Sequence, residues 1–240
     1  EDTKGQLWVG TNRGAYILDR VNNKFVPVLE EIIQKKEVSQ IGQDSEGNMI
    51  LSFFNLGLLK WNPQSGQSVL YDTEHPTLKL NENNIYAFAI DAQKRIWIGY
   101  YSQGISMLDE ANQRIVHYQH DPRNPNSLPN NYISSLAINP NGPILIGTNG
   151  GGLSILNPKN REFSNYMATD VPGSIISNSV NKLYFGPDGM LWAGCWGSGV
   201  SIYDKRYYKF THLKHKENIQ ESHSGKSVTS FAEDRNGNIW

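Results

Sequence analysis

The sequence predicts an all-β fold, a β-propeller built of four-stranded blades with a period of about 47 residues. Three observations predict it. Similar segments recur at a nearly constant interval, each repeat holds several short runs rich in β-branched and aromatic residues, and glycines recur where the chain has to turn. The recurrence is clearest at Trp8, whose equivalents follow at intervals of 42, 47, 48, 47 and 48 residues. These equivalents are Ile50, Trp97, Leu145, Trp192 and Trp240.

The first predicted strand of each repeat carries β-branched and aromatic residues and ends in a hairpin signal. In one repeat that signal is Asp-Ser-Glu-Gly-Asn, residues 44–48, and in another it is Asp-Arg-Asn-Gly-Asn, residues 234–238. Turns of this composition join antiparallel strands. The first strands are predicted to begin at residues 38, 85, 133, 180 and 228.

Three further strands complete each repeat. The second strand follows the hairpin signal, a glycine-bearing turn leads into the third, and a polar turn leads into a fourth such as 114–118 or 161–166. Four antiparallel strands in 40–50 residues are typical of a propeller blade. Helical solenoids share this period, but apolar residues at helical spacing are not sustained, and residues 30–38 are the one place where a helical turn fits.

The glycines support tight turns and close packing rather than a phosphate site. A phosphate loop needs Gly-Lys-Ser/Thr or the start of a helix, whereas the glycines of residues 147–152 lead into a strand. A glycine seven residues after the Trp-equivalent is expected to adopt a positive φ where the second strand turns into the third. A second glycine, inside the second strand, is expected to let a neighbouring blade pack closely. The first set is Gly57, Gly104, Gly152 and Gly199, and the second is Gly10, Gly99, Gly147 and Gly194, with Ser52 as a replacement.

The repeats are predicted to span residues 1–37, 38–84, 85–132, 133–179 and 180–227, with 228–240 starting a further blade. Two closures stay open. Residues 228–233 can pair beside residues 7–11 and close a ring of five, or the chain can be a slice of a larger ring. Five blades with these small inner residues would be tight, since rings typically hold about four to eight blades, and this favours the slice.

Composition excludes some functions. The 240 residues carry a net charge of −1, which gives no electrostatic footprint for nucleic acid or an anionic membrane. No apolar run approaches the roughly 18 residues of a membrane span, and no signal peptide is recognisable. Because the sequence starts within one repeat and stops within another, we expect further parts to lie outside it.

The units resemble two-component regulator propeller repeats. The resemblance rests on the run NSLPNNYISSLAINPNGPILIGTNGGGLSILNP, residues 126–158, and on GQLWVGTNRG, residues 5–14. The lead-in Asn-Ser-Leu, the turn Asp-x-x-Gly and the strand Leu-Trp-x-Gly-Thr occur in the family's order across nearly the whole chain. Departures occur at residues 52–54 and 195–196. The resemblance implies a segment of a seven-bladed ring, since family members typically carry two such propellers, a β-sandwich, a membrane helix and a cytoplasmic kinase.

The same resemblance implies a function and a location. It implies a periplasmic sensor segment of a hybrid two-component histidine kinase of polysaccharide-degrading gut bacteria, which binds an oligosaccharide and signals to the kinase. The parent protein is then anchored in the inner membrane and homodimeric, and the propeller itself is not an enzyme and needs no cofactor. The alternative is a propeller scaffold for protein–protein interaction, because propeller faces also bind proteins.

Candidate ligand contacts lie at the turns between second and third strands. Aligned turns of a propeller open on one face, and long inter-blade connections open there too, so their side chains are expected to ring the channel. Aromatic rings stack on sugar rings, and asparagine offers hydrogen bonds to hydroxyls. Arg123 and Lys79, on the connections, are placed to meet an acidic sugar, although a solvated charge is the simpler interpretation. The predicted ligand contacts are Asn12, Phe54, Tyr100, Tyr101, Asn149, Trp196 and Arg123.

Other conspicuous residues have simpler structural interpretations. Trp8, Trp97 and Trp192 recur at one strand position and are expected to anchor the core. The pairs His117/His120 and His212/His215 are three residues apart, which on a strand places the two rings on opposite faces and disfavours a metal site. Asp44, Glu46 and Asn48 resemble a cation loop, but turn chemistry explains them. Cys195 has no base nearby in the sequence, so a nucleophilic role is disfavoured.

Overall fold

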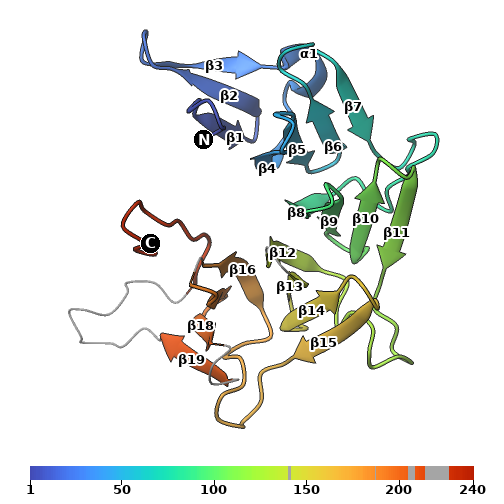
Figure 1. The fold of residues 1–240 in the computed structure, drawn as a ribbon, viewed down its shortest axis with the longest axis vertical. Coiled ribbons are helices and arrows are strands. Elements are labelled where there is room, and N and C mark those ends of the chain that lie inside the picture. The colour runs from blue at the N-terminus through green and yellow to red at the C-terminus, as the bar shows by residue number, and fades with distance from the viewer. Residues whose placement is uncertain (140–141, 187, 205–208, 214–226) are drawn as a thin grey trace. The chain divides into compact units, whose positions relative to one another are not determined.

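The computed structural model describes residues 1–139, 142–186, 188–204, 209–213 and 227–240 (Figure 1). Within these ranges the regular secondary structure is β-strand apart from one short helix, α1 (Glu30–Ile33), in the region where a helical turn fits the sequence. The chain divides into two compact units, Glu1–His117 and Tyr118–Trp240. The two units are described one after the other.

Unit 1 contains one three-stranded and two four-stranded antiparallel sheets, each ordered as in the sequence (Figure 1). Each sheet is therefore a meander, the pattern expected of a propeller blade. The first sheet comprises β1 (Trp8–Thr11), β2 (Gly14–Asp19) and β3 (Lys24–Val28); the second, β4 (Val38–Gln43), β5 (Met49–Phe53), β6 (Gly57–Trp61) and β7 (Ser68–Tyr71); and the third, β8 (Ile85–Ile90), β9 (Ile96–Tyr100), β10 (Ile105–Asp109) and β11 (Arg114–Tyr118).

Unit 2 contains two four-stranded sheets of the same kind. The all-β prediction with four-stranded blades is thus confirmed for the four complete sheets. The first sheet of unit 2 comprises β12 (Ile133–Ile138), β13 (Ile144–Thr148), β14 (Leu153–Asn157) and β15 (Glu162–Tyr166), and the second comprises β16 (Val180–Phe185), β17 (Leu191–Cys195), β18 (Gly199–Asp204) and β19 (Lys209–Leu213).

Burial differs from strand to strand within a sheet. All residues of β5, β9 and β13 are buried, whereas β15 alternates between exposed and half-buried residues. A strand covered on both faces reads as a continuous apolar run, and a strand covered on one face alternates. In the sheets that contain β5, β9 and β13 the second strand is therefore the centre of the core, and in the sheet that contains β15 the fourth strand is the outer edge.

Adjacent sheets pack closely because of the glycine inside the second strand. A Cβ built on Gly10 would lie 2.8 Å from Cγ1 of Val38, and one built on Gly147 would lie 2.9 Å from Cγ1 of Val180. In each case the valine begins the first strand of the next sheet in the same unit. The expectation that this glycine allows close inter-blade packing is confirmed at these positions.

Polar side chains of the first strands connect neighbouring sheets. The Ser39 hydroxyl donates a hydrogen bond to the carbonyl oxygen of Ile85 (2.6 Å) in unit 1. In unit 2 the Ser134 hydroxyl donates in the same way to the carbonyl of Val180, as does the Asn181 amide to that of Val228 (2.6 Å). We call this recurring residue the staple position, because its side chain binds the backbone of the next repeat, 46 or 47 residues later.

The hairpin turns also recur, and their aspartates hold the tryptophans. In unit 1 the carboxylate of Asp91 accepts hydrogen bonds from the backbone NH groups of Gln93 and Arg95 (3.0 Å each). Its second oxygen accepts the indole NH of Trp97 (2.9 Å), a side chain that is fully buried. The core role expected of the tryptophans is confirmed for Trp97, whereas Trp8 and Trp192 are half-buried.

One expected strand is not formed. Residues 228–233 contain no strand; a single antiparallel bridge joins Glu233 to Ile239, and Ala232 and Trp240 exchange backbone hydrogen bonds. In the complete sheets the first strand pairs with a second strand that starts one residue before the Trp equivalent. In this sequence only Ile239 and Trp240 correspond to that second strand, so the pairing is limited to the contacts of these two residues.

Candidate functional site

At the turns between second and third strands of the four complete sheets, a buried residue is followed by a more exposed one. The buried residue ends the second strand: Phe53, Tyr100, Thr148 and Cys195 are each 0% exposed. The next residue faces outward, because successive side chains of an extended chain point to opposite sides. Its backbone NH repeatedly donates to a carbonyl just before the first strand, as Tyr101 does to Asn84 (3.0 Å) and Trp196 to Ser179 (2.9 Å).

The sequence prediction that Tyr100 contacts a ligand is therefore wrong. We expected its ring to face a ligand at the turn, but it lies fully buried in the core cluster with Ile85, Ile98 and Leu108. Burial raises the pKa of the Tyr100 phenol well above its usual value, so the group stays neutral in the core. The neighbouring residue, Tyr101, is 46% exposed and has the position we had expected for both.

In unit 1, three aromatic rings form a surface cluster. Phe54 follows β5, Tyr86 lies in β8, and Tyr101 follows β9. The Tyr86 ring stacks on that of Tyr101, with centroids 5.7 Å apart and planes at 22°, and meets Phe54 edge-on at 4.7 Å. We call Phe54, Tyr86 and Tyr101 the aromatic cluster. The tertiary structure thus joins two predicted ligand contacts from different turns through a third ring.

Tyr86 was not predicted from the sequence, although a signal for it is present. It occupies the staple position, where Ser39, Ser134 and Asn181 carry small polar side chains. A large aromatic residue at a position that otherwise serves inter-blade hydrogen bonding departs from the structural pattern of the repeat. Comparing the same position across repeats would have singled it out.

A hydrogen-bonded polar frame surrounds the aromatic cluster. Asn84 accepts the backbone NH of Asn55 (3.0 Å) and donates its amide to Glu82 (3.1 Å). The other carboxylate oxygen of Glu82 accepts the backbone NH of Ser102 (2.8 Å). These contacts fix the turns that carry Phe54 and Tyr101, and they place a carboxylate beside the rings.

Asn12 lies on the turn of the first sheet in unit 1. The Thr11 hydroxyl shapes this turn by donating to the carbonyl of Gly14 (2.9 Å) and accepting the NH of Arg13 (3.0 Å). Asn12 itself is exposed. Its role in ligand binding stays a prediction.

The remaining predicted contacts lie in unit 2. Asn149 accepts a hydrogen bond from the Ser179 hydroxyl (3.0 Å), and the carbonyl of Ser179 accepts the NH of Trp196. The Trp196 side chain is 63% exposed. Arg123 lies exposed in the connection between β11 and β12, where its backbone NH binds the Asp121 carboxylate (2.9 Å). Unit 2 thus brings Asn149 and Trp196 together through Ser179.

The histidines have structural partners. Ser106 and His117 form a cross-strand hydrogen bond (2.6 Å), and Ser201 and His212 form the equivalent one (3.2 Å). Burial lowers the pKa of His117, which favours its neutral form. His215 lies outside the described residues. Among the described residues, no group of three or more His, Cys, Asp or Glu side chains is arranged to hold a metal ion.

The Asp44 turn and Cys195 are also structural. Asp44 accepts the backbone NH groups of Glu46 and Asn48 (2.9 Å each), as the turn interpretation predicts. Burial opposes ionisation of Asp44, but these hydrogen bonds outweigh it and lower the pKa of the carboxyl. Burial raises the pKa of the Cys195 thiol to about 11, so little thiolate forms at neutral pH.

In the described part of the chain, no helix has the length and apolar character needed to span a lipid bilayer.

Comparison with protein families gives a match inside unit 1. Residues 79–102 match the family model described as two component regulator propeller. This stretch contains β8 and β9 together with Glu82, Tyr86 and Tyr101. It therefore includes two of the three rings of the aromatic cluster and part of its polar frame. No curated protein sequence matches the chain.

Several solved structures share the fold. The extracellular domain of a protein described as hybrid two component system BT3049 from B. thetaiotaomicron has a TM-score of 0.63 and 20% identity, and the alignment covers 100% of this chain and 37% of that one. The extracellular domain of BT4673 from the same organism, described as a one component system, has a TM-score of 0.69 and 17% identity, covering 100% and 39%. PorZ, a surface component of the type-IX secretion system of Porphyromonas gingivalis, has a TM-score of 0.71 and 15% identity, covering 95% and 34%.

These similarities concern the fold, because all three identities are 20% or lower. The chain spans less than two fifths of the length of each of these structures. What the family match adds is a repeat type for residues 79–102, which include Tyr86 and Tyr101.

Proposed function

We propose that this chain, whose residues 79–102 form a two component regulator propeller repeat, is part of the extracytoplasmic sensor region of a hybrid two-component signalling protein and binds an oligosaccharide at the aromatic cluster. The family match and the fold shared with extracellular domains of such systems support the sensor role. In this proposal the propeller is a non-catalytic, periplasmic module that needs no cofactor.

The observation that carries the ligand proposal is the replacement of a staple residue by Tyr86. Elsewhere in both units this position serves the scaffold through a hydrogen bond to the next repeat. At Tyr86 it carries a ring that lies between those of Phe54 and Tyr101. Phe54 and Tyr86 are half-buried and Tyr101 is 46% exposed, so the two inner rings support the exposed face of Tyr101 in a defined orientation.

The chemistry of the aromatic cluster suits a neutral sugar. The flat face of an aromatic ring accepts the apolar CH groups of a pyranose, and nearby amides and hydroxyls can bind its hydroxyl groups. Asn55 and Ser102 lie on the turns that carry Phe54 and Tyr101. The Glu82 carboxylate binds the backbone NH of Ser102, beside Tyr101, and would repel an acidic sugar there. We therefore propose neutral oligosaccharides as ligands of this cluster.

A calorimetric titration tests the proposal. The chain is titrated with neutral oligosaccharides of different sugar composition, and the one that binds is repeated with Tyr86→Ala and Tyr101→Ala. Loss of a ring contact of about 0.5–1.5 kcal/mol weakens binding about 2- to 13-fold. Phe25→Ala is the matched control, because Phe25 is an aromatic residue of unit 1, 52% exposed, on β3. Equal affinity in all four proteins would place the ligand elsewhere and overturn the site.

Signalling is proposed for the parent protein. Ligand binding shifts a conformational equilibrium of a membrane-anchored homodimer toward the state that regulates its cytoplasmic kinase, and the shift is limited by the difference in ligand affinity between the two states. In the full-length protein, Tyr86→Ala should raise the sugar concentration needed for half-maximal phosphorylation while leaving the maximum unchanged. A lowered maximum at saturating sugar would instead assign Tyr86 to signal transmission.

One observation favours the alternative, a scaffold for protein–protein interaction. Trp196 is 63% exposed, and within the described residues no ring contact covers it. Exposed tryptophans are frequent anchors of protein interfaces. If the scaffold function is correct, Trp196→Ala disrupts self-association measured by analytical ultracentrifugation, and sugar binding is absent from the wild-type chain.

A further inference from the structure

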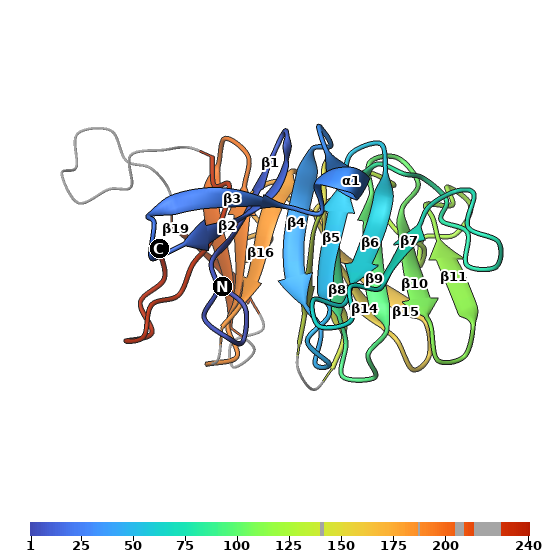
Figure 2. The ribbon, with the colours of Figure 1, turned by 90° about the horizontal axis from the view of Figure 1, so that it is seen from above.

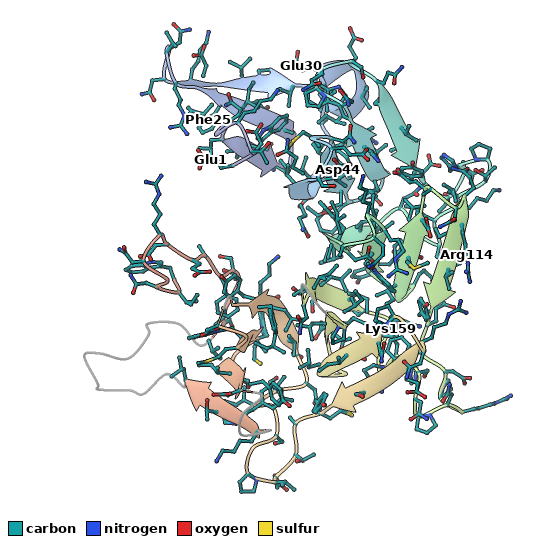
Figure 3. All side chains as sticks on the ribbon, in the orientation of Figure 1. Glu1, Phe25, Glu30, Asp44, Arg114 and Lys159 are labelled. Carbon is teal, nitrogen blue, oxygen red and sulfur yellow. The ribbon has the colours of Figure 1, made fainter. Side chains whose placement is uncertain are left out.

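A pocket of about 170 Å³ lies in unit 1 between α1 and the strands β2 and β3. Figure 2 shows α1 on the connection that leads from β3 to β4, and Figure 3 shows Glu30 at its start. Ala15 and Ile33, both only 1% exposed, line its inner part, and Tyr16 lines one side. Its outer edge carries the charged residues Arg13, Lys35 and Glu30. The pocket therefore combines an apolar interior with charges at the opening.

Backbone contacts hold the opening in place. The NH of Lys35 donates to the carbonyl of Arg13 (3.3 Å), which ties the two basic residues together. The segment between β3 and β4 is left-handed at both ends of α1, with φ of 57° at Leu29 and 60° at Lys35. Such conformations cost roughly 1 kcal/mol or more for residues with a Cβ and persist only where the surroundings impose them. Lys35 is thus held at the pocket rather than placed there by a freely moving loop.

The charges at the opening are not neutralised by the protein. In the described part of the chain, neither Arg13 nor Lys35 forms an ion pair, although both are exposed and four other basic residues of unit 1 do: Arg20, Lys60, Lys94 and Arg95. Glu30 is the one acidic residue among those that line the pocket. Two basic residues and one acidic residue give the lining a formal net charge of +1. This charge matches a singly charged anion better than a doubly charged one.

We propose that this pocket binds a small ligand that carries one carboxylate, such as a single uronic acid residue. Arg13 and Lys35 bind the carboxylate through charge-assisted hydrogen bonds, and the ring lies between Tyr16 and the apolar interior. Its size suits one sugar ring rather than a chain. This proposal is independent of the neutral oligosaccharide proposed for the aromatic cluster, since none of the three cluster rings lines the pocket.

Titration of the ¹⁵N-labelled chain with sodium glucuronate, followed by amide chemical shifts, tests the proposal. A titration with sodium chloride at equal ionic strength corrects for the effect of salt. Glucose serves as the uncharged counterpart of glucuronate. We expect saturable shifts at residues 13–16 and 33–35 with glucuronate and none with glucose. Equal shifts with glucose, or no saturable shift at these residues with glucuronate, would overturn the proposal.

Three variants make the test specific. Arg13→Gln should weaken glucuronate binding about 10- to 150-fold, because a hydrogen bond to a charged group is worth about 1.5–3 kcal/mol. Glu30→Gln should strengthen it, because it removes the repelling carboxylate; weakening would show that Glu30 binds a ligand cation and would contradict the assignment. Lys24→Gln, which removes an exposed charge of β3 that does not line the pocket, is the control and should leave binding unchanged. Tyr86→Ala should also leave it unchanged, which separates this site from the aromatic cluster.

Discussion

The turn after β9 in unit 1 and the turn after β17 in unit 2 share a backbone and differ in what surrounds their exposed aromatic residue. In both, a buried residue is followed by an aromatic one whose NH binds the chain just before the first strand. Tyr101 stacks on Tyr86, whereas the staple position of the unit 2 sheet carries Asn181, which binds the next repeat. The exposed ring of Tyr101 therefore stacks on an aromatic staple residue, whereas the staple residue of the unit 2 sheet is not aromatic.

If the two units share one scaffold, the same glycine is indispensable at the corresponding turn of each unit, and its replacement has the largest expected effect. A Cβ on Gly57 in unit 1 would lie 2.2 Å from the carbonyl oxygen of Tyr71, and one on Gly152 in unit 2 would lie 2.3 Å from that of Tyr166. Both glycines have positive φ, 105° and 76°. Gly57→Ala and Gly152→Ala should each lower the free energy of unfolding by about 3–5 kcal/mol in urea denaturation.

Gly66→Ala is the control for these variants. Gly66 has φ of 73°, but no atom lies within 4 Å of the added Cβ. It should therefore cost only about 1 kcal/mol, the penalty of the left-handed conformation. The losses in free energy of unfolding caused by Gly57→Ala and Gly152→Ala should be similar, and both should exceed the loss caused by Gly66→Ala. If only one of the two losses exceeds that of Gly66→Ala, the two units do not share the same turn.

The second prediction concerns the hairpin aspartate in buried and exposed settings. Asp91→Ala leaves the indole NH of the fully buried Trp97 without its acceptor and Arg95 without its ion pair (2.6 Å). We expect a loss of about 2–4 kcal/mol in the free energy of unfolding. Asp234 makes the same contact to Trp240 (3.2 Å), but Trp240 is 76% exposed, so Asp234→Ala should change stability little. Equal losses would show that the turn, and not burial of the indole, sets the cost.

The third prediction exchanges the residues of the staple position. Tyr86→Ser introduces the residue of Ser39 and Ser134, so it should keep the fold while weakening oligosaccharide binding about 2- to 13-fold in calorimetry. Asn181→Tyr is the reverse change: it gives Trp196 an aromatic neighbour and gives up a hydrogen bond worth about 1 kcal/mol. Tryptophan fluorescence quenching by acrylamide should fall in Asn181→Tyr, and unchanged quenching would contradict the idea that the staple residue orders the turn.

The smallest expected effect is a difference in alkaline pH dependence. Burial lowers the pKa of Lys60, but the carboxylates of Glu110 (2.5 Å) and Asp44 (3.6 Å) outweigh burial and raise it above 10.5. A raised lysine pKa gives stability that is complete below pH 10.5 and is lost as the pH rises through the folded-state value. In unit 2, burial lowers the pKa of Lys182, so its contribution to stability instead increases as the pH rises toward 10.5.

Difference curves isolate the two lysines. The free energy of unfolding is measured between pH 8 and 11.5 for the wild-type chain, Lys60→Met and Lys182→Met, and each variant is subtracted from the wild type. The Lys60 curve should fall above pH 10.5, and the Lys182 curve should rise below it. Curves of the same sign would show that one of the two lysines has a different environment from the one described.

The repeat itself was predictable because it depends on short-range chemistry. The glycine at 57, 104, 152 or 199 follows from the need for a positive φ, and all four have one. The hairpin turns follow from Asp-x-x-Gly, in which the carboxylate binds the backbone two and four residues later, as Asp44 does. The prediction of a strand at residues 228–233 is wrong, because a strand also needs a neighbouring strand that satisfies its backbone hydrogen bonds.

The sequence by itself determined the blade, its period and the residues that turn the chain, because each of these depends on contacts within about 20 residues. Only the tertiary structure decided that Tyr100 is buried while Tyr101 is exposed, and that Tyr86, from a different strand, completes the aromatic cluster. The same holds for Arg13 and Lys35, which are 22 positions apart and meet at one pocket. Side chains from separate elements become neighbours through packing, and packing is a property of the folded chain.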